Sequence, residues 1–364
     1  MSGEGSVSMS GTPRTWSFVD DETGVCGWVA LDALVGGLAF GGMRVSAETS
    51  KEEVEELAHS MTRKLFIHDS PVGGAKAGLA ISPSDPRLEG VLKRFAKAME
   101  EPLSGGVTLG KDMGTTNTTL DRLYEGFGRP QLHLIGGEGV PERLRDFVGY
   151  RRHMTGLGVA WASAALLGRR ISEARVAIQG FGAVGVGAAV RLTEMGARVV
   201  AVSDHRHCWC FEGALSRPTI EAMASAGRVR PHMASVEATR CGRDSLLAQE
   251  VDLLVLAANS NSVSAEVAET IRASVVVEGS NFGLTKEARE VLLRKGVEVI
   301  PDLIASSSSA AMVANQLANR GDLGHDELWI RIEDCIRDGV KRYHSLSERG
   351  VRSIRQALID EIEG

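Results

Sequence analysis

The spacing of apolar residues predicts an amphipathic helix in the first third of the chain. Four apolar residues between positions 54 and 65 recur at intervals of three and four, which places them on one helical face. Ser50 and Glu53 precede them with the spacing of a capping box. We therefore expect a helix from about Ser50 to about Phe66, with Lys64 in its last turn.

Glycine and proline interrupt the pattern directly after this helix. Pro71, Gly73 and Gly74 predict a loop that delivers Lys76 in front of Gly78, where few side chains would keep a ligand from the backbone. Taken alone, Lys64 is a cation that complements the helix dipole. Two ammonium groups in a closed cleft would also disfavour each other's charged form, and a lysine in such surroundings can act as a general base.

Strand-like and helix-like patterns alternate through the rest of the chain, which is typical of an α/β fold. The turn formers at 20–24 predict a hairpin between strands at 16–19 and 26–31. In the first half we further expect a strand at 79–81, a helix with an apolar stripe at 88–99 begun by Ser84 or Asp85, a strand at 107–109 and a helix from about Thr116. In the second half we expect helices at 153–167, 186–195, 326–343 and 351–362, with strands at 175–179, 199–203, 251–256, 274–278 and 297–300.

The length of 364 residues suits two domains, and a Gly- and Pro-punctuated stretch at 131–145 marks the boundary between them. We predict a disordered tail at 1–14, a substrate-binding and oligomerisation domain at 15–145, a dinucleotide-binding domain at 146–325 and C-terminal helices at 326–364 that pack back across the domain junction.

A dinucleotide-binding fingerprint lies in the second domain. The G-x-G-x-x-G sequence at 180–185 falls between a predicted strand and a predicted helix, and Asp204 ends the next strand about 20 residues further on. Asp204 would bind the adenosine ribose hydroxyls and favour NAD, whereas Arg206 and the neighbouring histidines could serve a 2′-phosphate, so NADP stays open. The predicted cofactor residues here are Gly180, Gly182, Ala183, Val184, Gly185, Asp204 and Arg206.

The sequences MTRK at 61–64 and GGAKAG at 73–78 resemble the substrate loop of the glutamate/leucine/phenylalanine/valine dehydrogenases. The resemblance implies that Lys64 holds the substrate α-carboxylate and that Lys76 is the catalytic lysine. It also assigns to Asp112 the proton-shuttling carboxylate, although an aspartate beside glycine after a strand is by default a turn residue. The implied reaction is the reversible NAD(P)-dependent oxidative deamination of an L-amino acid.

Three further segments resemble cofactor-side segments of the same family. The T-G-L-G-V sequence implies that Thr155 contacts the nicotinamide carboxamide. The loops AANSNSVS and EGSNFG add Ala258, Asn259 and Asn281 as cofactor residues. A run of serines, Ser306–Ser309, replaces the family's N-A-G-G, which puts the hinge and the surroundings of the substrate amine in doubt.

The residues at the family's side-chain pocket point away from glutamate. Glutamate-specific members place a lysine and a serine where this chain has Phe40 and Val313, and a side-chain carboxylate is costly to bury without a cation. The other predicted pocket residues are Gly41, Gly42, Gly110 and Ala310. An apolar or aromatic amino acid is the expected substrate, and the pocket is most similar to that of the leucine/phenylalanine branch. A reductase of an unusual 2-oxo or imino acid and an inactive NAD-binding relative are the alternatives.

Composition and charge narrow the remaining classes. A net charge of −6 argues against nucleic acid as a partner, and no apolar run is long enough to span a membrane. We expect a cytoplasmic homo-oligomer that acts on a small amino acid or on a 2-oxo acid with ammonia. The five cysteines are scattered, so no disulfide framework is expected. The His205–Cys210 segment lacks a second ligand pair, so we predict a reduced loop and no metal.

Overall fold

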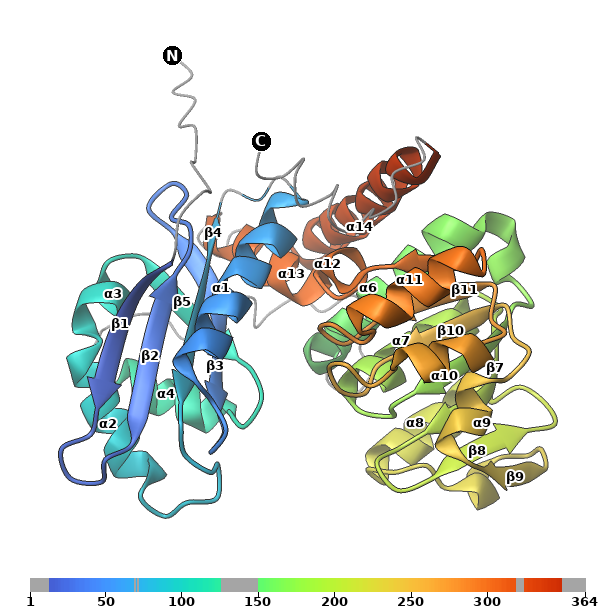
Figure 1. The fold of residues 1–364 in the computed structure, drawn as a ribbon, viewed down its shortest axis with the longest axis horizontal. Helices are drawn as coiled ribbons and strands as arrows, with labels where there is room; N and C mark the ends of the chain where they lie inside the picture. Colours follow the sequence, from blue (N-terminus) through green and yellow to red (C-terminus); the bar gives the residue numbers. More distant parts are fainter. Residues whose placement is uncertain (1–12, 69, 71, 126–149, 319–323, 349–364) are drawn as a thin grey trace. The chain divides into compact units, whose positions relative to one another are not determined.

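The computed structural model describes residues 13–68, 70, 72–125, 150–318 and 324–348, and these form two compact units (Figure 1). Within the described residues, the first unit contains 13–125 and 310–329, and the second contains 150–309 and 330–348. The division therefore falls at different places from the boundary expected at 325. The stretch at 131–145, the expected helix at 351–362 and most of the expected N-terminal tail lie outside the described residues.

The first unit is built on a five-stranded mixed sheet of order β1-β2-β4-β3-β5. β1 pairs with β2, and β2 with β4, in antiparallel fashion, whereas β3 runs parallel to both β4 and β5. The predicted hairpin is confirmed, because β1 and β2 flank the turn at 20–24. The strands are β1 (Arg14–Val19), β2 (Cys26–Leu31), β3 (Ala39–Val45), β4 (Gly73–Leu79) and β5 (Val107–Lys111).

Within the described residues, four helices lie wholly in the N-terminal part of the first unit. The sequence predicts the start of one of them correctly and the start of another incorrectly. The helix α1 begins where predicted, with the Ser50 hydroxyl accepting the Glu53 N–H. The helix α2 was expected to begin at Ser84 or Asp85, which is wrong: it begins after Arg87, which makes no side-chain cap. Asp85 instead accepts the N–H of Arg87 in the turn before the helix. The helices are α1 (Lys51–Phe66), α2 (Leu88–Ala98), α3 (Glu100–Ser104) and α4 (Asn117–Tyr124).

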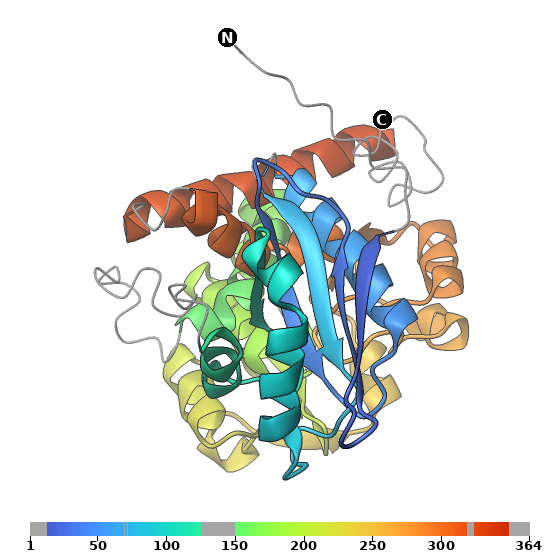
Figure 2. The same ribbon diagram turned by 90° about the vertical axis from the view of Figure 1, so that its left-hand side faces the viewer.

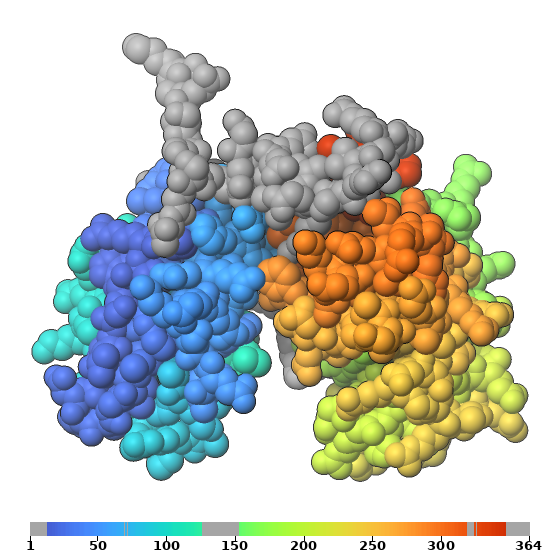
Figure 3. Space-filling model, viewed as in Figure 1, coloured from blue at the N-terminus to red at the C-terminus, as the bar shows by residue number. Residues whose placement is uncertain are grey.

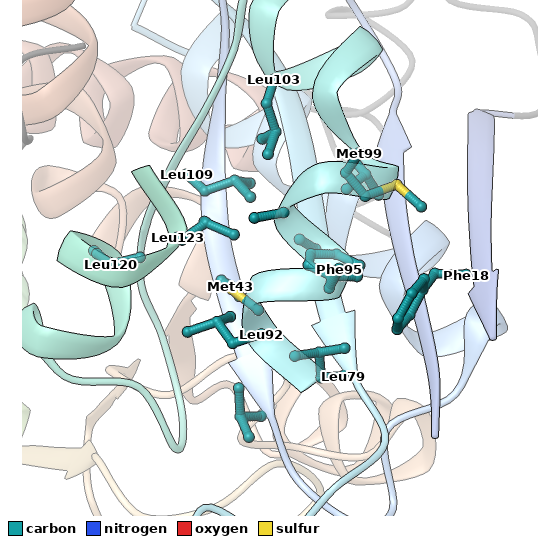
Figure 4. Packing of buried hydrophobic residues seen from close by; sticks show 14 of the residues in the cluster. Phe18, Met43, Leu79, Leu92, Phe95, Met99, Leu103, Leu109, Leu120 and Leu123 are labelled. Atoms are coloured by element: carbon teal, nitrogen blue, oxygen red, sulfur yellow. The ribbon is translucent and has the colours of Figure 1, made fainter. Parts of the chain in front are cut away.

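One face of this sheet carries the hydrophobic core of the unit, and α2, α3 and α4 cover it (Figures 2 and 4). Phe95 of α2 is fully buried and meets Phe18 of β1 edge to face, with ring centroids 5.5 Å apart. Met43 of β3 and Leu109 of the edge strand β5 point into the same cluster. Alternate residues of these strands must then face the other side of the sheet, where α1 packs.

The loop predicted to deliver Lys76 is wrong, because residues 73–79 form the buried strand β4. Their composition, GGAKAGL, lacks the β-branched residues that mark a strand. The glycines are needed because α1 crosses close by: a Cβ on Gly74 would lie 2.2 Å from the Thr62 hydroxyl, and one on Gly78 would lie 2.6 Å from Val54. Lys76 therefore projects from the centre of a sheet and not from a loop.

The second unit has a seven-stranded sheet of order β12-β11-β10-β6-β7-β8-β9. The five strands from β12 to β7 are parallel, as predicted for a dinucleotide-binding fold. A buried apolar cluster joins α9, α10 and α11 to the sheet, and α7 packs against both α6 and α8 (Figure 1). Figure 3 shows the outer surface of this unit, coloured mainly from green to orange. The strands are β6 (Arg175–Gln179), β7 (Arg198–Ser203), β8 (Cys208–Phe211), β9 (Ala238–Cys241), β10 (Leu253–Leu256), β11 (Val275–Glu278) and β12 (Glu298–Ile300).

The helices of the second unit follow the predicted order with shifted ends. The helix α7 begins three residues before the expected position, directly after Gly182. The chain passes between the two units within α13 and α14. The helices are α6 (Tyr150–Leu167), α7 (Ala183–Glu194), α8 (Arg217–Ser225), α9 (Arg243–Leu247), α10 (Ala265–Thr270), α11 (Lys286–Arg294), α12 (Asp302–Ala305), α13 (Ser308–Ala318) and α14 (His325–Glu348), with short 3₁₀ turns at Gly168–Ile171 and Pro231–Met233.

The prediction of a loop at His205–Cys210 is also wrong for the second half of this segment. Cys208–Phe211 form β8, which runs antiparallel to both β7 and β9 and extends the parallel sheet. Among the described residues, no group of three or more His, Cys, Asp or Glu side chains is arranged to hold a metal ion. In the same part of the chain, no helix is both long and apolar enough to cross a membrane.

Candidate active site

Lys76 and Asp112 meet on the face of the first sheet that lies opposite the hydrophobic core. Lys76 projects from β4, and Asp112 directly follows β5. The Lys76 Nζ lies 2.7 Å from an Asp112 carboxylate oxygen, and Lys76 is only 5% exposed. The structure thus brings together two residues that are far apart in the sequence and to which the family resemblance gives catalytic roles.

Gly42 makes room for this pair. It lies on β3, opposite Gly110 of β5 in the sheet register. A Cβ on Gly42 would lie 2.8 Å from the Cβ of Asp112 and 3.2 Å from the Lys76 Nζ. Because real Cβ atoms do not approach a neighbour within 3.0 Å, any side chain at position 42 would displace the carboxylate.

The Asp112 carboxyl is held in its ionised form. Burial raises its pKa, but the positive charges of Lys76 and Arg44 outweigh this effect. The Met113 N–H lowers the pKa further by a hydrogen bond to the carboxylate, and the net result is a pKa well below its usual range. Asp112 can therefore accept or relay a proton only while a neighbouring cation changes its own charge or position.

Arg44 is a functional candidate that the sequence analysis missed. Its Nε lies 3.2 Å from the same Asp112 oxygen that Lys76 contacts, and its side chain is 14% exposed. Its other end pairs at 2.5 Å with Glu53, in the first turn of α1. Glu53 therefore does not complete the predicted capping box. The position of Arg44 two residues after Gly42 on the same strand was the available signal, because residues i and i+2 of a strand face one side.

Lys64 lies in the C-terminal turn of α1, as predicted, and is buried to 6% exposure. The location supports the dipole interpretation as well as the carboxylate interpretation. A lysine is rarely buried to this degree, because a buried ammonium group is costly unless it is paired or hydrogen-bonded.

Three of the residues predicted to line the side-chain pocket, Phe40, Ala310 and Val313, belong to one apolar cluster of the first unit. Phe40, at 7% exposure, packs with Leu65 and Val72 and with Ala310 and Ala314 of α13. Val313 is partly buried against the same cluster.

Two of the predicted pocket glycines have structural reasons to be glycine. A Cβ on Gly110 would lie 3.0 Å from the Phe40 ring, so Gly110 allows that ring its position. A Cβ on Gly41 would lie 1.6 Å from the Ala75 carbonyl oxygen, so Gly41 allows β3 and β4 to approach.

In the second unit, the glycine fingerprint has the shape that a dinucleotide pyrophosphate needs. Gly180 has φ +95, and a Cβ on Gly185 would lie 1.8 Å from the Gly180 carbonyl oxygen. Gly182 precedes α7 without a side-chain cap, and a Cβ there would meet open space. The first amides of α7, at Ala183 and Val184, are thus left for an anion at the helix N-terminus. The residues present therefore fit a dinucleotide.

The other predicted cofactor loops converge near this fingerprint. A Cβ on Gly180 would lie 2.9 Å from the Ala258 amide nitrogen, so the loop after β10, which also carries Asn259, borders the glycine turn. The N–H groups of Gly279 and Ser280 donate to the Leu256 carbonyl, which brings the Asn281 loop beside β10.

Thr155 lies on α6, which packs tightly against α7. A Cβ on the neighbouring Gly156 would lie 2.1 Å from the Val184 carbonyl oxygen, and the His153 Nδ1 is 2.7 Å from the Ala183 carbonyl. Thr155 is half-buried beside this contact. The place expected for the nicotinamide contact is thus next to the N-terminal turn of α7.

Asp204 directly follows β7, close to the predicted place, but its carboxylate accepts hydrogen bonds from three backbone N–H groups. It accepts the N–H groups of Arg206 at 2.7 Å, His207 at 2.8 Å and Val229 at 3.1 Å. Burial raises the pKa of Asp204, and these three hydrogen bonds outweigh it and lower the pKa. Asp204 therefore organises its own turn.

Three of the four serines that depart from the family pattern, Ser306, Ser307 and Ser308, are buried and hydrogen-bonded to backbone carbonyls. Ser306 donates to the Asp302 carbonyl and Ser307 to the Ile304 carbonyl, so each stabilises the end of α12. Ser308 donates at 2.8 Å to the Met154 carbonyl of α6, where a Cβ on Gly158 would lie 2.2 Å from its Oγ. The three hydroxyls therefore link the segment at the start of α13 to carbonyl groups of α12 and α6.

Two family models match this chain. Residues 18–128 match the model "Glu/Leu/Phe/Val dehydrogenase, dimerisation domain", and residues 148–359 match the model "Glutamate/Leucine/Phenylalanine/Valine dehydrogenase". The chain belongs to this dehydrogenase family. The models span both units and assign the family without assigning one of its branches.

Individual relatives agree with the family assignment. Glutamate dehydrogenase A2 of Halobacterium salinarum is 33% identical over 73% of this chain, and the match spans 66% of that relative, slightly less than two thirds. The glutamate dehydrogenase of Thermotoga maritima is 32% identical over 76% of this chain and 68% of its own length. The crystal structure of a hetero-hexameric glutamate dehydrogenase from Thermus thermophilus in a leucine-bound form has a TM-score of 0.76, with 26% identity, 96% coverage of this chain and 88% of that one.

Proposed function

We propose that this member of the dehydrogenase family catalyses the reversible NAD(P)-dependent oxidative deamination of an L-amino acid to a 2-oxo acid and ammonia. The observation that carries the proposal is the contact at 2.7 Å between the buried Lys76 and the half-buried Asp112, which places a lysine and a carboxylate close enough to exchange a proton. Its place on a glycine-lined sheet face supports the same conclusion, because small residues leave room for a substrate beside the pair.

The chain's own residues divide the work. Lys64 binds the α-carboxylate, which orients the Cα of the substrate. Lys76 then activates the water that attacks the imine carbon, and Asp112 moves protons between Lys76, the departing amine and solvent. Arg44 keeps the Asp112 carboxylate in place while the charge of Lys76 changes during this exchange.

The dinucleotide supplies the hydride acceptor when it is bound. Gly180, Gly182 and Gly185 would hold its pyrophosphate at the N-terminus of α7, and Thr155 its carboxamide. Ala258, Asn259 and Asn281 would contact it from the loops after β10 and β11.

We propose an apolar or aromatic amino acid as the substrate. The support is the cluster of Phe40, Leu65, Val72, Ala310 and Ala314, which presents hydrocarbon where a side-chain carboxylate would need a cation. The relatives compared above are named glutamate dehydrogenases, so glutamate is the second candidate.

Two alternative functions were left open by the sequence, an inactive NAD-binding relative and a reductase of an unusual 2-oxo or imino acid. The contact between Lys76 and Asp112, with Gly42 making room for it, argues against an inactive relative. A reductase of an unusual 2-oxo acid uses the same residues in the reverse direction. Homo-oligomerisation is proposed from the match to the dimerisation-domain model.

The test is the formation of reduced nicotinamide, followed by absorbance at alkaline pH with NAD or NADP and a panel of L-amino acids that includes bulky aromatic ones. We expect reduction with leucine, phenylalanine or a related substrate and weak reduction with glutamate. Activity with glutamate alone would make glutamate the substrate. Silence across the panel, followed by oxidation of reduced dinucleotide with 2-oxo acids and ammonia, would favour the reductase.

A further inference from the structure

Three of the five cysteines, which are scattered along the sequence, meet where β8 pairs with β9 (Figure 1). Cys208 and Cys210 are two residues apart on β8 and therefore share one face of the sheet. Cys241 ends β9 and lies directly opposite Cys208 in the register. Residues opposite each other on paired strands face the same side, so the three side chains form one thiol cluster.

A direct contact joins two members of this cluster. The Sγ atoms of Cys210 and Cys241 lie 3.1 Å apart. A disulfide bond has a length of about 2.05 Å, so the two sulfurs would have to approach by only about 1 Å. Both residues are half-buried and open to a small oxidant, whereas Cys208 is 3% exposed. Geometry and access therefore select Cys210 and Cys241 from the cluster.

The position of β9 allows the two sulfurs to approach. β9 is the last strand of its sheet and is held there by β8. None of its residues, Ala238–Cys241, is fully buried. A small shift of such an edge strand leaves the apolar interior closed, so formation of the S–S bond costs little packing.

Packing explains Cys208 but not the contact between the other two thiols. Cys208 is buried in the apolar cluster of the sheet, as free cysteine commonly is. Cys210 and Cys241 pack against that cluster and also contact each other. A thiol is a weak donor and a weak acceptor, so this contact adds little to stability. Its chemical consequence is larger, because it places two oxidisable groups within reach of each other.

The environment of Cys241 divides the two roles. Burial, together with the like charge that Cys210 and Cys208 would carry when ionised, raises the pKa of Cys241 well above its ordinary value. Cys241 is therefore a protonated thiol at neutral pH, and the thiolate is the form that attacks an oxidant. Cys241 suits the second step of disulfide formation, in which a thiol condenses with a sulfenic acid. The first step falls to Cys210.

We propose that Cys210 and Cys241 form a reversible intramolecular disulfide in the presence of a peroxide. The Cys210 thiolate attacks one oxygen of hydrogen peroxide, the O–O bond breaks, and Cys210 becomes a sulfenic acid while hydroxide leaves and takes up the proton of the original thiol. The Cys241 sulfur then attacks the sulfenic sulfur, the S–S bond forms, and the displaced hydroxyl leaves as water with the Cys241 proton. Two thiols thus lose two electrons in all, and one peroxide becomes two waters. A dithiol restores both cysteines by thiol–disulfide exchange. This chemistry is independent of the proposed deamination.

Thiol counting on the full-length protein tests the proposal. Reduced protein is treated with hydrogen peroxide, the remaining thiols are alkylated under denaturing conditions, and the mass of the chain is measured. We expect two of the five thiols to be lost, no covalent dimer on a non-reducing gel, and full recovery of the thiols after treatment with dithiothreitol. Peptide mapping should then show Cys241 linked to the peptide that contains Cys210.

Substitutions are needed to identify the partner of Cys241, because no lysine or arginine separates Cys208 from Cys210 and both fall in one tryptic peptide. Cys210→Ser and Cys241→Ser should each abolish the linked peptide, whereas Cys208→Ser should retain it. Cys26→Ser is the matched control, since Cys26 is also half-buried but belongs to the first unit; it should retain the link. Cys210→Ala and Cys241→Ala repeat the test with a second side chain, and thermal unfolding shows that each variant is folded.

Several outcomes would overturn the proposal. A linked peptide that persists in Cys210→Ser, or that disappears in folded Cys208→Ser, would assign the bond to Cys208 and refute the selected pair. Retention of all five thiols, or oxidation to sulfinic acid without a linked peptide, would refute disulfide formation. A link found only between two chains would refute an intramolecular bond. A link that dithiothreitol does not reduce would refute its reversibility.

Discussion

Removal of the Arg44 guanidinium tests whether the Asp112 carboxylate works as part of a three-residue unit. In Arg44→Gln, Asp112 keeps its contact with Lys76 at 2.7 Å but loses the contact at 3.2 Å, and Glu53 loses its partner. A hydrogen bond to a charged group contributes about 1.5–3 kcal/mol. In the proposed mechanism this contact holds the carboxylate in position during proton transfer, so we expect kcat to fall about 10- to 100-fold.

The pH dependence separates a catalytic effect from a general loss of structure. Arg44 is one of two cations that lower the Asp112 pKa, so its removal raises that pKa back toward the usual value. The acid limb of the kcat profile should then move to higher pH. Steady-state rates between about pH 3 and 7, a range that brackets the ordinary aspartate pKa of about 4, measure this, with dinucleotide binding and thermal unfolding recorded for each variant.

Glu53→Gln is the matched control, since it releases the far end of Arg44 and leaves the contact with Asp112 intact. We expect a smaller loss of kcat and an unmoved acid limb. An Arg44→Gln protein that is folded, with wild-type kcat and an unchanged pH profile, would refute the idea that Arg44 supports Asp112.

The candidate site leads to two further predictions, and the Asp20–Arg94 ion pair leads to a third. Lys76→Ala and Asp112→Asn should each lower kcat by about 100-fold or more while dinucleotide affinity stays within about twofold, as fluorescence titration would show; near-normal turnover in either would remove that residue from the mechanism. Phe40→Lys should raise kcat/KM for glutamate at least tenfold relative to that for leucine, and an unchanged ratio would mean that Phe40 does not line the pocket. Asp20 accepts hydrogen bonds from Arg94 that lower its pKa to about 2, so its contribution to stability is present above the ordinary aspartate pKa and is lost as pH falls toward 2. Arg94→Gln should therefore weaken the loss of stability between pH 4 and 2 in chemical unfolding experiments, and an acid dependence equal to that of the wild type would contradict this.

Local patterns were sufficient to predict several elements. The apolar stripe and Ser50 predict the helix α1, and the turn formers at 20–24 predict the β1–β2 hairpin. The fingerprint at 180–185 lies between a strand and a helix as predicted, and two of its glycines have local reasons: Gly180 has a positive φ, and a Cβ on Gly185 would meet the Gly180 carbonyl. In these cases the information lies within about 20 residues of sequence.

Elements that depend on distant parts of the chain were missed. The sequence of β4 resembles a loop because it is rich in glycine. These glycines are required by the close approach of α1, which crosses the strand at Thr62 and Val54. The strand β8 was read as part of a loop because its four residues form a strand only through pairing with β7 and β9. Short strands of this kind carry little propensity signal of their own.

The candidate site shows the same limit. Lys76 and Asp112 were found by family resemblance, and the structure then placed them in contact. Arg44 carries no motif, and its spacing of two residues from Gly42 gains meaning only from its contacts with Asp112 and Glu53, which come from other elements. The occupation of Asp204 by three backbone N–H groups was likewise invisible, because Val229 lies 25 residues away.

The central claim is that this protein removes the amino group of an apolar L-amino acid, and the balance of products tests it most directly. Purified full-length protein would be incubated with leucine or phenylalanine and NADP or NAD, and reduced dinucleotide, ammonia and 2-oxo acid would be quantified in the same samples. The account predicts equal amounts of the three products in the wild type and none above background in Lys76→Ala. Reduced dinucleotide without ammonia, or all three products from glutamate but not from apolar amino acids, would contradict it.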